Sequence, residues 1–235
     1  MTRLLLASAS PARRATLRAA GIEPVVAVSG VDEHHVLAEA VATSGALSPA
    51  DAVLVLARAK AQDVAGTLAR QPPTGDLVVL GCDSMLEFEG EVLGKPADAA
   101  DATARWRAMR GRCGVLHTGH WLIDARPDDG TGGATGATAS TTVWFADVSD
   151  EEIEAYVATT EPLRVAGAFT IDGLGGPFVE RIDGDHHTVV GLSLPLLRRL
   201  LATLGIGLTD LWAGEIVGTP QTAAPAGGGG RQLPG

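Results

Sequence analysis

The stretch of residues 4–21 constrains the fold most, because it predicts a strand, a tight loop and a helix in immediate succession. Residues 4–6 are all leucine and predict a short apolar strand. Ser10 suits the N-cap of a helix, Pro11 suits its first position, and Gly21 suits its end. We therefore expect the N-terminus of the helix to point out of the carboxyl end of the strand.

The start of this helix is predicted to bind an anion. Free backbone N–H groups and the positive end of the helix dipole point in the same direction there. Arg13 and Arg14 lie in the first turn, where the dipole disfavours cations by roughly 0.3–1 kcal/mol each. No acidic residue lies between Ser8 and Ala20 to offset them. An outside anion such as phosphate would complete the site, and the alternative is a surface helix with two solvated arginines.

The composition narrows the class of molecule. The 235 residues are 46% hydrophobic and 20% charged, which is typical of a soluble globular enzyme of one large or two small domains. A net charge of −10 argues against nucleic-acid polymers as partners. No signal peptide is visible, and no apolar run approaches the ~20 residues that cross a bilayer. We therefore expect no membrane partner and a cytoplasmic location.

Lysine is unusually rare in this chain. Only Lys60 and Lys95 are lysines among the 18 basic residues, and asparagine is absent, which is typical of a GC-rich genome. In such a chain arginine replaces lysine wherever any cation suffices. The two remaining lysines are predicted to lie where a compact ammonium is needed, and the alternative is that they survive by chance.

The order of the elements predicts the fold class. Strands alternate with helices in the first half and strand pairs follow, which favours a mixed α/β sheet. We expect an acidic loop over residues 29–35, a long helix over 50–68, a buried strand over 77–82 and a mobile loop over 126–139. Ser149 begins a predicted capping box.

The end of the chain differs in composition from the rest. Residues 213–235 are rich in proline, alanine and glycine and include four consecutive glycines. Such a low-complexity segment is predicted to be disordered. The globular domain is therefore expected to span residues 1–212.

Two acidic residues are candidates for chemistry. Asp83 follows the buried strand, and ligands gather outside the carboxyl ends of strands in open α/β sheets. An acid there is a helix cap, a metal ligand or a general base, and the strand-like residues 85–88 disfavour the cap. Glu33 also follows a predicted strand, so the pair suggests Mg²⁺ or Mn²⁺ beside phosphate. Lys60 and Lys95 would add positive charge along a polyphosphate.

These candidate residues fall within seven short sequence motifs. In chain order they are Ser8-Ala9-Ser10-Pro11 with Arg13-Arg14, Val31-Asp32-Glu33, Ala57-Arg58-Ala59-Lys60-Ala61, Gly81-Cys82-Asp83-Ser84, Gly94-Lys95-Pro96, Glu161-Pro162 with Ala166-Gly167-Ala168-Phe169, and Asp183-Gly184-Asp185 with Val190-Gly191-Leu192. This set resembles the motifs of the Maf family and covers residues 4–200. The resemblance implies a nucleoside triphosphate pyrophosphatase, which releases a nucleoside monophosphate and pyrophosphate. It also implies an elongated mixed sheet with flanking helices, a deep cleft between two lobes, a homodimer and a divalent metal.

The resemblance also assigns roles to single residues. Asp83 matches the family's proton acceptor, and Glu33 matches its partner acid near the metal. The residues that match the family's polyphosphate-binding residues are Ser8, Arg13, Lys60 and Lys95. Arg14 lies in the first motif, beside Arg13. Attack at a phosphorus atom flanked by anionic oxygens needs charge neutralisation and an oriented water, which a carboxylate can deprotonate.

Three positions bear on the choice of base. Family members that act on dTTP and UTP carry arginine, threonine and glutamine where this chain has Ala12, Ser84 and Asp172. A second branch, which acts on 7-methyl-GTP, has a non-arginine residue at the first position and an acid at the third. The chain therefore leans toward a purine or a modified guanine, and its base preference stays open.

One alternative function comes from the same resemblance. Some family members are linked to arrest of septum formation, so the chain could be a nucleotide-binding regulator of cell division without essential catalysis. Nothing in the sequence beyond the family resemblance supports that alternative.

Overall fold

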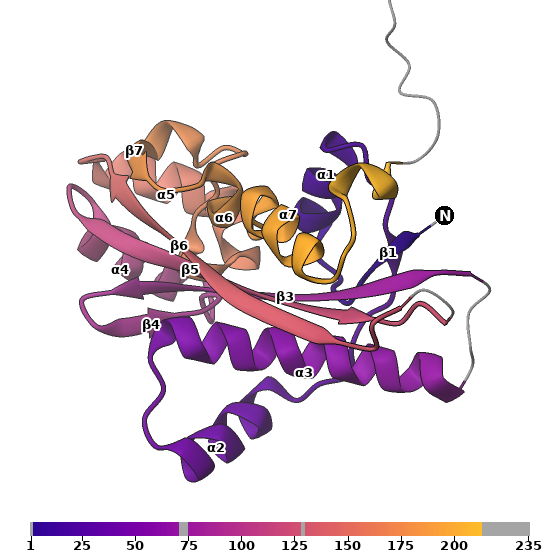
Figure 1. Ribbon diagram of the computed structural model, residues 1–235. Helices are drawn as coiled ribbons and strands as arrows, with labels where there is room; N and C mark the ends of the chain where they lie inside the picture. The colour runs from indigo at the N-terminus through magenta and orange to yellow at the C-terminus, as the bar shows by residue number, and fades with distance from the viewer. Residues whose placement is uncertain (1, 71–74, 128–129, 213–235) are drawn as a thin grey trace, which may run out of the picture.

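The computed structural model describes residues 2–70, 75–127 and 130–212. The expected disorder of residues 213–235 therefore lies outside the described residues. Within the described ranges the chain forms one mixed sheet with helices on both of its faces (Figure 1). No helix in this part of the chain is both long enough and apolar enough to cross a membrane.

The strands confirm the predicted mixed α/β sheet. In chain order the elements are β1 (Arg3–Leu6), α1 (Pro11–Ala19), β2 (Val25–Val26), α2 (Glu33–Ser44), α3 (Pro49–Arg70), β3 (Leu77–Phe88), β4 (Glu91–Leu93), α4 (Ala99–Met109), β5 (Cys113–Asp124), β6 (Ala134–Phe145), α5 (Asp150–Ala158), the 3-10 helices η1 (Glu161–Arg164), η2 (Ala166–Ala168) and η3 (Gly176–Phe178), β7 (Val179–Asp183), α6 (His186–Val190), α7 (Leu194–Thr203) and η4 (Leu208–Leu211). The strand order is β2-β1-β3-β5-β6-β7, with β4 paired to β3. Among the described strands, β1 pairs in parallel with both β2 and β3, and every other pairing is antiparallel.

The central strand β3 corrects the expectation that a strand ends at Asp83. It runs unbroken for 12 residues, pairing with β1 as far as Leu80 and with antiparallel β5 from Val78 to Glu87. Because β5 continues the ladder after β1 stops, Asp83 lies in the middle of β3. It nevertheless lies just past the carboxyl end of β1, where the loop to α1 begins.

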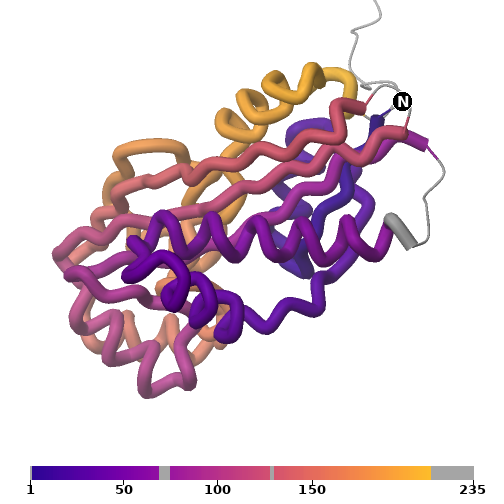
Figure 2. Tube along the Cα trace, turned by 60° about the horizontal axis from the view of Figure 1, so that its bottom comes forward, coloured from indigo at the N-terminus to yellow at the C-terminus, as the bar shows by residue number. Residues whose placement is uncertain are grey.

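Two glycines let α3 approach one face of the sheet closely. A Cβ atom on Gly81 would lie 2.0 Å from the carbonyl oxygen of Ala57, and one on Gly119 would lie 2.3 Å from that of Val53. Only glycine at these two positions leaves room for the helix backbone. Figure 2 shows α3 running along the sheet, with α2 beside it.

The opposite face is covered in two parts. Leu17 of α1 and Leu197 of α7 are fully buried against β1 and the first half of β3. Trp106 of α4 is fully buried in a second cluster, where its ring meets Phe145 and Tyr156 edge to face. The deep cleft between two lobes stays a prediction.

Two segments expected as loops are partly regular structure. Helix α2 begins at Glu33 because the carboxylate of Asp32 accepts the N–H of His35 at 3.1 Å. Strand β6 begins at Ala134, whose partner in the ladder is Ile123, so residues 134–139 of the expected loop belong to the sheet. The sequence predicted neither α2 nor α6. The expected long helix and the capping box at Ser149 are confirmed as α3 and the start of α5.

Candidate active site

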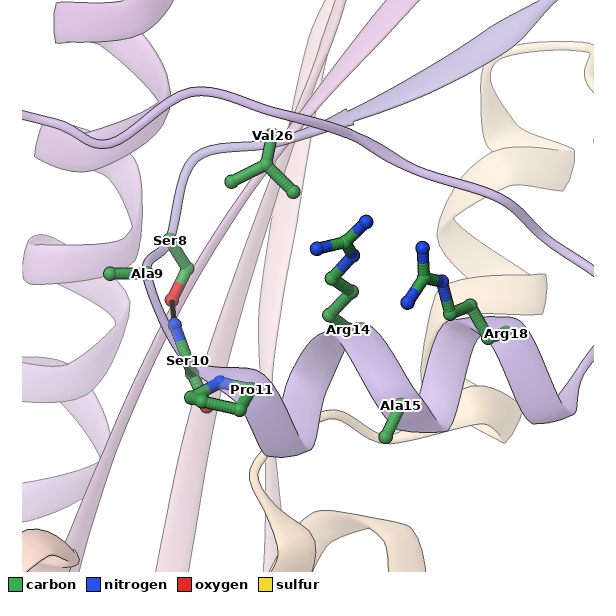
Figure 3. Close-up of a pocket in the computed structure, with 8 residues that line it drawn as sticks. All are labelled: Ser8, Ala9, Ser10, Pro11, Arg14, Ala15, Arg18 and Val26. Atoms are coloured by element: carbon green, nitrogen blue, oxygen red, sulfur yellow. Dashed lines mark hydrogen bonds between the residues drawn. The ribbon is translucent and has the colours of Figure 1, made fainter.

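Helix α1 begins as the sequence predicts. The hydroxyl of Ser10 accepts the N–H of Arg13 at 3.4 Å, Pro11 occupies the first position, and the first turn holds no acidic residue. The hydroxyl of Ser8 accepts the N–H of Ser10 at 3.2 Å, which holds the loop against the helix (Figure 3). The positive end of α1 therefore carries no internal counter-charge in its first turn.

A cavity of about 320 Å³ opens beside this helix start. The residues that line it are Ser8, Ala9, Ser10, Pro11, Arg14, Ala15, Arg18 and Val26. Arg14 and Arg18 leave α1 on the same side, toward Val26 of β2 (Figure 3). Sequence reasoning missed Arg18, although its spacing of four residues from Arg14 places both on one helix face.

The cations of this cavity have one internal partner. Glu23 accepts two hydrogen bonds from Arg18, at 2.7 and 2.6 Å, and lies 3.6 Å from Arg14. All three side chains are about half exposed, so solvent screens these pairs and they contribute little. An entering anion can therefore compete with Glu23 for both arginines.

Arg13 does not line the cavity, and the expectation that it lacks a partner is wrong. Its side chain is buried, with Nε donating to the carbonyl of Gly191 at 2.7 Å. Nη1 donates to the hydroxyl of Ser8 at 3.0 Å and to the carbonyl of Cys82 at 2.9 Å, and Nη2 donates to the hydroxyl of Ser84 at 3.0 Å. Four of the five guanidinium N–H groups are thus used inside the protein.

The edge of β3 explains why Arg13 is held there. The N–H of Ala7 reaches the carbonyl of Leu80 at 2.8 Å, and β1 then ends. The next carbonyl on that edge of β3 belongs to Cys82, and Arg13 supplies its hydrogen bond. The arginine therefore takes the place of a strand that has stopped, and sequence spacing could not show this because the partners are far apart in the chain.

Ser84 links Arg13 to strand β5 by hydrogen bonds. The hydroxyl of Thr118 donates to the carbonyl of Thr188 at 2.9 Å, so it can only accept from the hydroxyl of Ser84, which lies 2.9 Å away. The donors thus run in one direction from Arg13 through Ser84 and Thr118 to Thr188. Both threonines are fully buried, and sequence reasoning missed them.

Asp83, Lys60 and Glu33 meet as predicted. The Nζ atom of Lys60 lies 2.5 Å from Oδ1 of Asp83 and 2.7 Å from Oε1 of Glu33. The side chains of Lys60 and Asp83 are 12% and 11% exposed, whereas that of Glu33 is 51% exposed. Glu33 reaches this point from the first turn of α2 and not from the end of a strand, which corrects the sequence interpretation.

Burial raises the pKa of Asp83 above its ordinary value. The charges of Lys60 and Arg13 and the hydrogen bond from Lys60 act in the opposite direction, and the charge of Glu33 adds to the increase. A raised pKa brings a carboxylate closer to neutral pH, where a general base is most effective.

The donor set fits a hard divalent cation. Glu33 and Asp83 both direct carboxylate oxygens at the same ammonium group, so they already converge on one positive charge. The described residues contain no group of three or more potential ligands among His, Cys, Asp and Glu. Two carboxylates with the remaining positions left to water and phosphate oxygens are typical of Mg²⁺ and not of a structural metal site.

The structure leaves three other predicted residues apart from this cluster. Lys95, in the turn after β4, and Asp172, in the loop before η3, are exposed and form no hydrogen bond or ion pair with any residue that the structure describes. Ala12 lies half buried in α1. The roles of Ala12, Ser84 and Asp172 in base recognition stay predictions.

The sequence was compared with protein families and with proteins of known name. The pattern of the family described as Maf-like protein matches residues 3–204. A protein of Salinispora tropica named nucleoside triphosphate pyrophosphatase is 61% identical over 213 residues, which cover 90% of this chain and 88% of that protein. Proteins of the same name from Streptomyces coelicolor and Leifsonia xyli are each 56% identical, over 90% and 89% of this chain and 95% and 96% of their own lengths.

Proposed function

The chain belongs to the Maf-like protein family, and we propose on that premise that it hydrolyses nucleoside triphosphates to a nucleoside monophosphate and pyrophosphate. The observation that carries the proposal is the contact of one lysine, Lys60, with the two carboxylates Asp83 and Glu33. The names of the relatives support the same activity.

The cationic cavity supports a role in binding the phosphate chain. Ser8, the N–H groups at the start of α1, Arg14 and Arg18 surround a space that is open to an anion. Lys60 contacts the carboxylate of Asp83, and Arg13 holds Ser8 of the loop between β1 and α1 in place. Neutralising the phosphate oxygens lowers the barrier to attack by water at phosphorus.

Asp83 is the residue we assign to proton acceptance. Its carboxylate is buried, its pKa is raised by that burial, and Lys60 keeps its ionised form accessible. In the ionised state it orients a water molecule and takes its proton during attack. Glu33 pairs with the same lysine and is half exposed, so its carboxylate is accessible to a cation from solvent.

We also propose that the enzyme depends on Mg²⁺ or Mn²⁺, held by Glu33 and Asp83. Such an ion would supply charge neutralisation at the phosphate oxygens and a more acidic bound water. The convergence of the two carboxylates on Lys60 supports this assignment, because the same oxygens suit a hard cation.

A panel of nucleoside triphosphates tests the proposed function. The purified protein is incubated with each triphosphate and with Mg²⁺ or Mn²⁺, and pyrophosphate is assayed. We expect release from at least one purine nucleotide, dependent on the cation. Folded protein that releases pyrophosphate from no triphosphate with either cation would refute the proposal.

We also propose a homodimer, which the family resemblance implies, and a cytoplasmic location, where nucleoside triphosphates are made and used. No observation in the structure favours a regulator of cell division that lacks catalysis. We therefore propose the enzymatic function alone.

A further inference from the structure

The segment that carries Asp172 is wrapped around a second carboxylate, that of Glu161. Oε1 of Glu161 accepts the hydroxyl of Thr170 at 2.5 Å and the N–H of Gly175 at 3.1 Å. Oε2 accepts the N–H of Leu174 at 3.1 Å. These donors come from both sides of Asp172, so one carboxylate ties the two arms of the loop over residues 170–176 together.

Two glycines of the loop lie close to this carboxylate and to the tyrosine beside it. A Cβ atom on Gly173 would lie 2.7 Å from Oε2 of Glu161. A Cβ atom on Gly175 would lie 2.4 Å from the hydroxyl oxygen of Tyr156. A Cβ at Gly175 would also lie 2.7 Å from the backbone carbonyl of Thr170, so a side chain at this position would open the loop, and one at Gly173 would displace the carboxylate of Glu161.

Tyr156 joins the loop to the rigid core. Its hydroxyl donates to Oε1 of Glu161 at 3.1 Å and accepts the N–H of Thr170 at 3.2 Å. Its ring packs against Trp106 and Phe178, with centroids 5.6 and 5.4 Å away. The carboxylate is thus held from the core side as well as from the loop side.

The segment between Glu161 and the loop is tied to the turn that carries Lys95. The N–H of Gly167, in η2 between Glu161 and the loop, donates to the carbonyl of Gly94 at 3.1 Å. Gly94 precedes Lys95, one of the two lysines that match the family's polyphosphate-binding residues. This hydrogen bond anchors the segment before the loop to the turn that carries Lys95.

The side chains at the tip of this loop have no hydrogen-bond or ion-pair partner among the residues that the structure describes. Asp172 is exposed and has no hydrogen bond or ion pair with the residues that the structure describes, and Leu174 is 59% exposed. A carboxylate that accepts N–H groups and an apolar side chain beside it suit the edge and face of a nucleobase. We propose that Glu161 is the positioning residue for base recognition, because it holds Asp172 where the base of the bound nucleotide is read. This inference rests on the proposed function.

The test separates the base from the phosphate chain. The variants are Glu161→Gln and Thr170→Val, which remove the acceptor charge and one donor, and the matched control is Glu154→Gln on the exposed face of α5. The readouts are kcat and KM over a panel of nucleoside triphosphates, and inhibition by inorganic tripolyphosphate, which has no base. Equilibrium binding of nucleoside monophosphates provides a readout that needs no turnover.

We expect the ratio of kcat/KM between the best and the worst base to fall at least fivefold in Glu161→Gln, mainly through KM. Thr170→Val should change it in the same direction, and the inhibition constant of tripolyphosphate should stay within twofold in every variant. Retention of the base ratio in both variants, or equal weakening of tripolyphosphate and nucleotide, would overturn the inference. If Glu161→Gln does not fold, the ratio of kcat/KM between bases in Thr170→Val tests the inference.

Failure of the proposed function gives a different pattern. A wild-type protein that binds nucleoside monophosphates with a base preference but hydrolyses no triphosphate would refute the proposed activity. The role of Glu161 would then be tested by the ratio of monophosphate affinities between bases in each variant. A wild-type protein that binds all bases equally would overturn the role of Glu161.

Discussion

The ammonium group of Lys60 lies 2.5 Å from Oδ1 of Asp83, and this pair joins α3 to the middle of β3. Its position depends on Gly81 and Gly119, which bring the helix close to the sheet. The ion pair keeps a buried carboxylate partly available in its charged form.

Replacing Lys60 should move the pH dependence of the reaction. Lys60 lowers the pKa of Asp83 against the effect of burial, so Lys60→Met should raise that pKa further. Because the general base must be ionised, the acid limb of kcat/KM should shift to higher pH, and activity at pH 7 should fall at least tenfold. Lys95→Met is the control, because Lys95 does not contact Asp83. Identical pH profiles for both variants would contradict this role of Lys60.

Gly81→Ala should destabilise the protein and impair the site together. The added Cβ would meet the backbone of α3 at 2.0 Å, so the helix must move, at a cost of about 3 kcal/mol in the free energy of unfolding. Gly66→Ala on the same helix is the control, since a Cβ there meets nothing within 4 Å and should add about 0.5–1 kcal/mol. Urea denaturation measures both, and a Gly81→Ala protein of unchanged stability would refute the close packing of α3.

Arg13→Lys should cost far more stability than Arg14→Lys. A lysine cannot reproduce the four hydrogen bonds of the buried guanidinium to Gly191, Ser8, Cys82 and Ser84. Leaving buried carbonyls unpaired should lower the free energy of unfolding by about 3 kcal/mol. Arg14 is half exposed, so its replacement should change stability by less than about 0.5 kcal/mol. Equal losses in the two variants would show that Arg13 is not a structural link.

Protonation of His120 should destabilise the fold at mildly acidic pH. Its imidazole is fully buried, accepts the N–H of Ser193 at 2.8 Å and lies beside the carbonyl of Thr118. Burial lowers its pKa from 6.5 to about 4, so stability is complete above pH 6.5 and is lost as pH falls toward 4. The contribution to unfolding free energy lost between pH 7.5 and 5 should be about 2 kcal/mol.

Urea denaturation at the two pH values checks this effect. His120→Gln should show a smaller difference between pH 7.5 and 5 than the wild type does. His35→Gln, on the exposed surface of α2, should retain the full difference. A His120→Gln protein with the full pH dependence would contradict the assignment.

Local sequence signals predicted those parts of the fold that depend on neighbours in the chain. The cap at Ser10, the proline at Pro11 and the capping box at Ser149 are local, and each lies where the sequence placed it. The end of the strand at Asp83 was misplaced, because its length is set by pairing with β5, some 35 residues later. Helix α2 was not predicted at all, because its start at Glu33 lies inside the segment expected as an acidic loop.

The same division holds for the candidate site. Lys60, Asp83 and Glu33 could be predicted to meet because the motif set of the family places them together. The burial of Arg13 could not be predicted, since it depends on Gly191 and on the exposed edge of β3. Thr118, Thr188 and Glu161 bear polar groups whose partners become visible only in the folded chain.

Identification of the products tests the central claim most directly. Wild-type protein and Asp83→Asn are incubated with the preferred triphosphate and a divalent cation, and nucleotides and phosphates are separated and quantified. We predict equal amounts of nucleoside monophosphate and pyrophosphate from the wild type, and a rate reduced about 10²–10⁴-fold in Asp83→Asn. Release of nucleoside diphosphate with orthophosphate, or an Asp83→Asn variant as active as the wild type, would contradict the account.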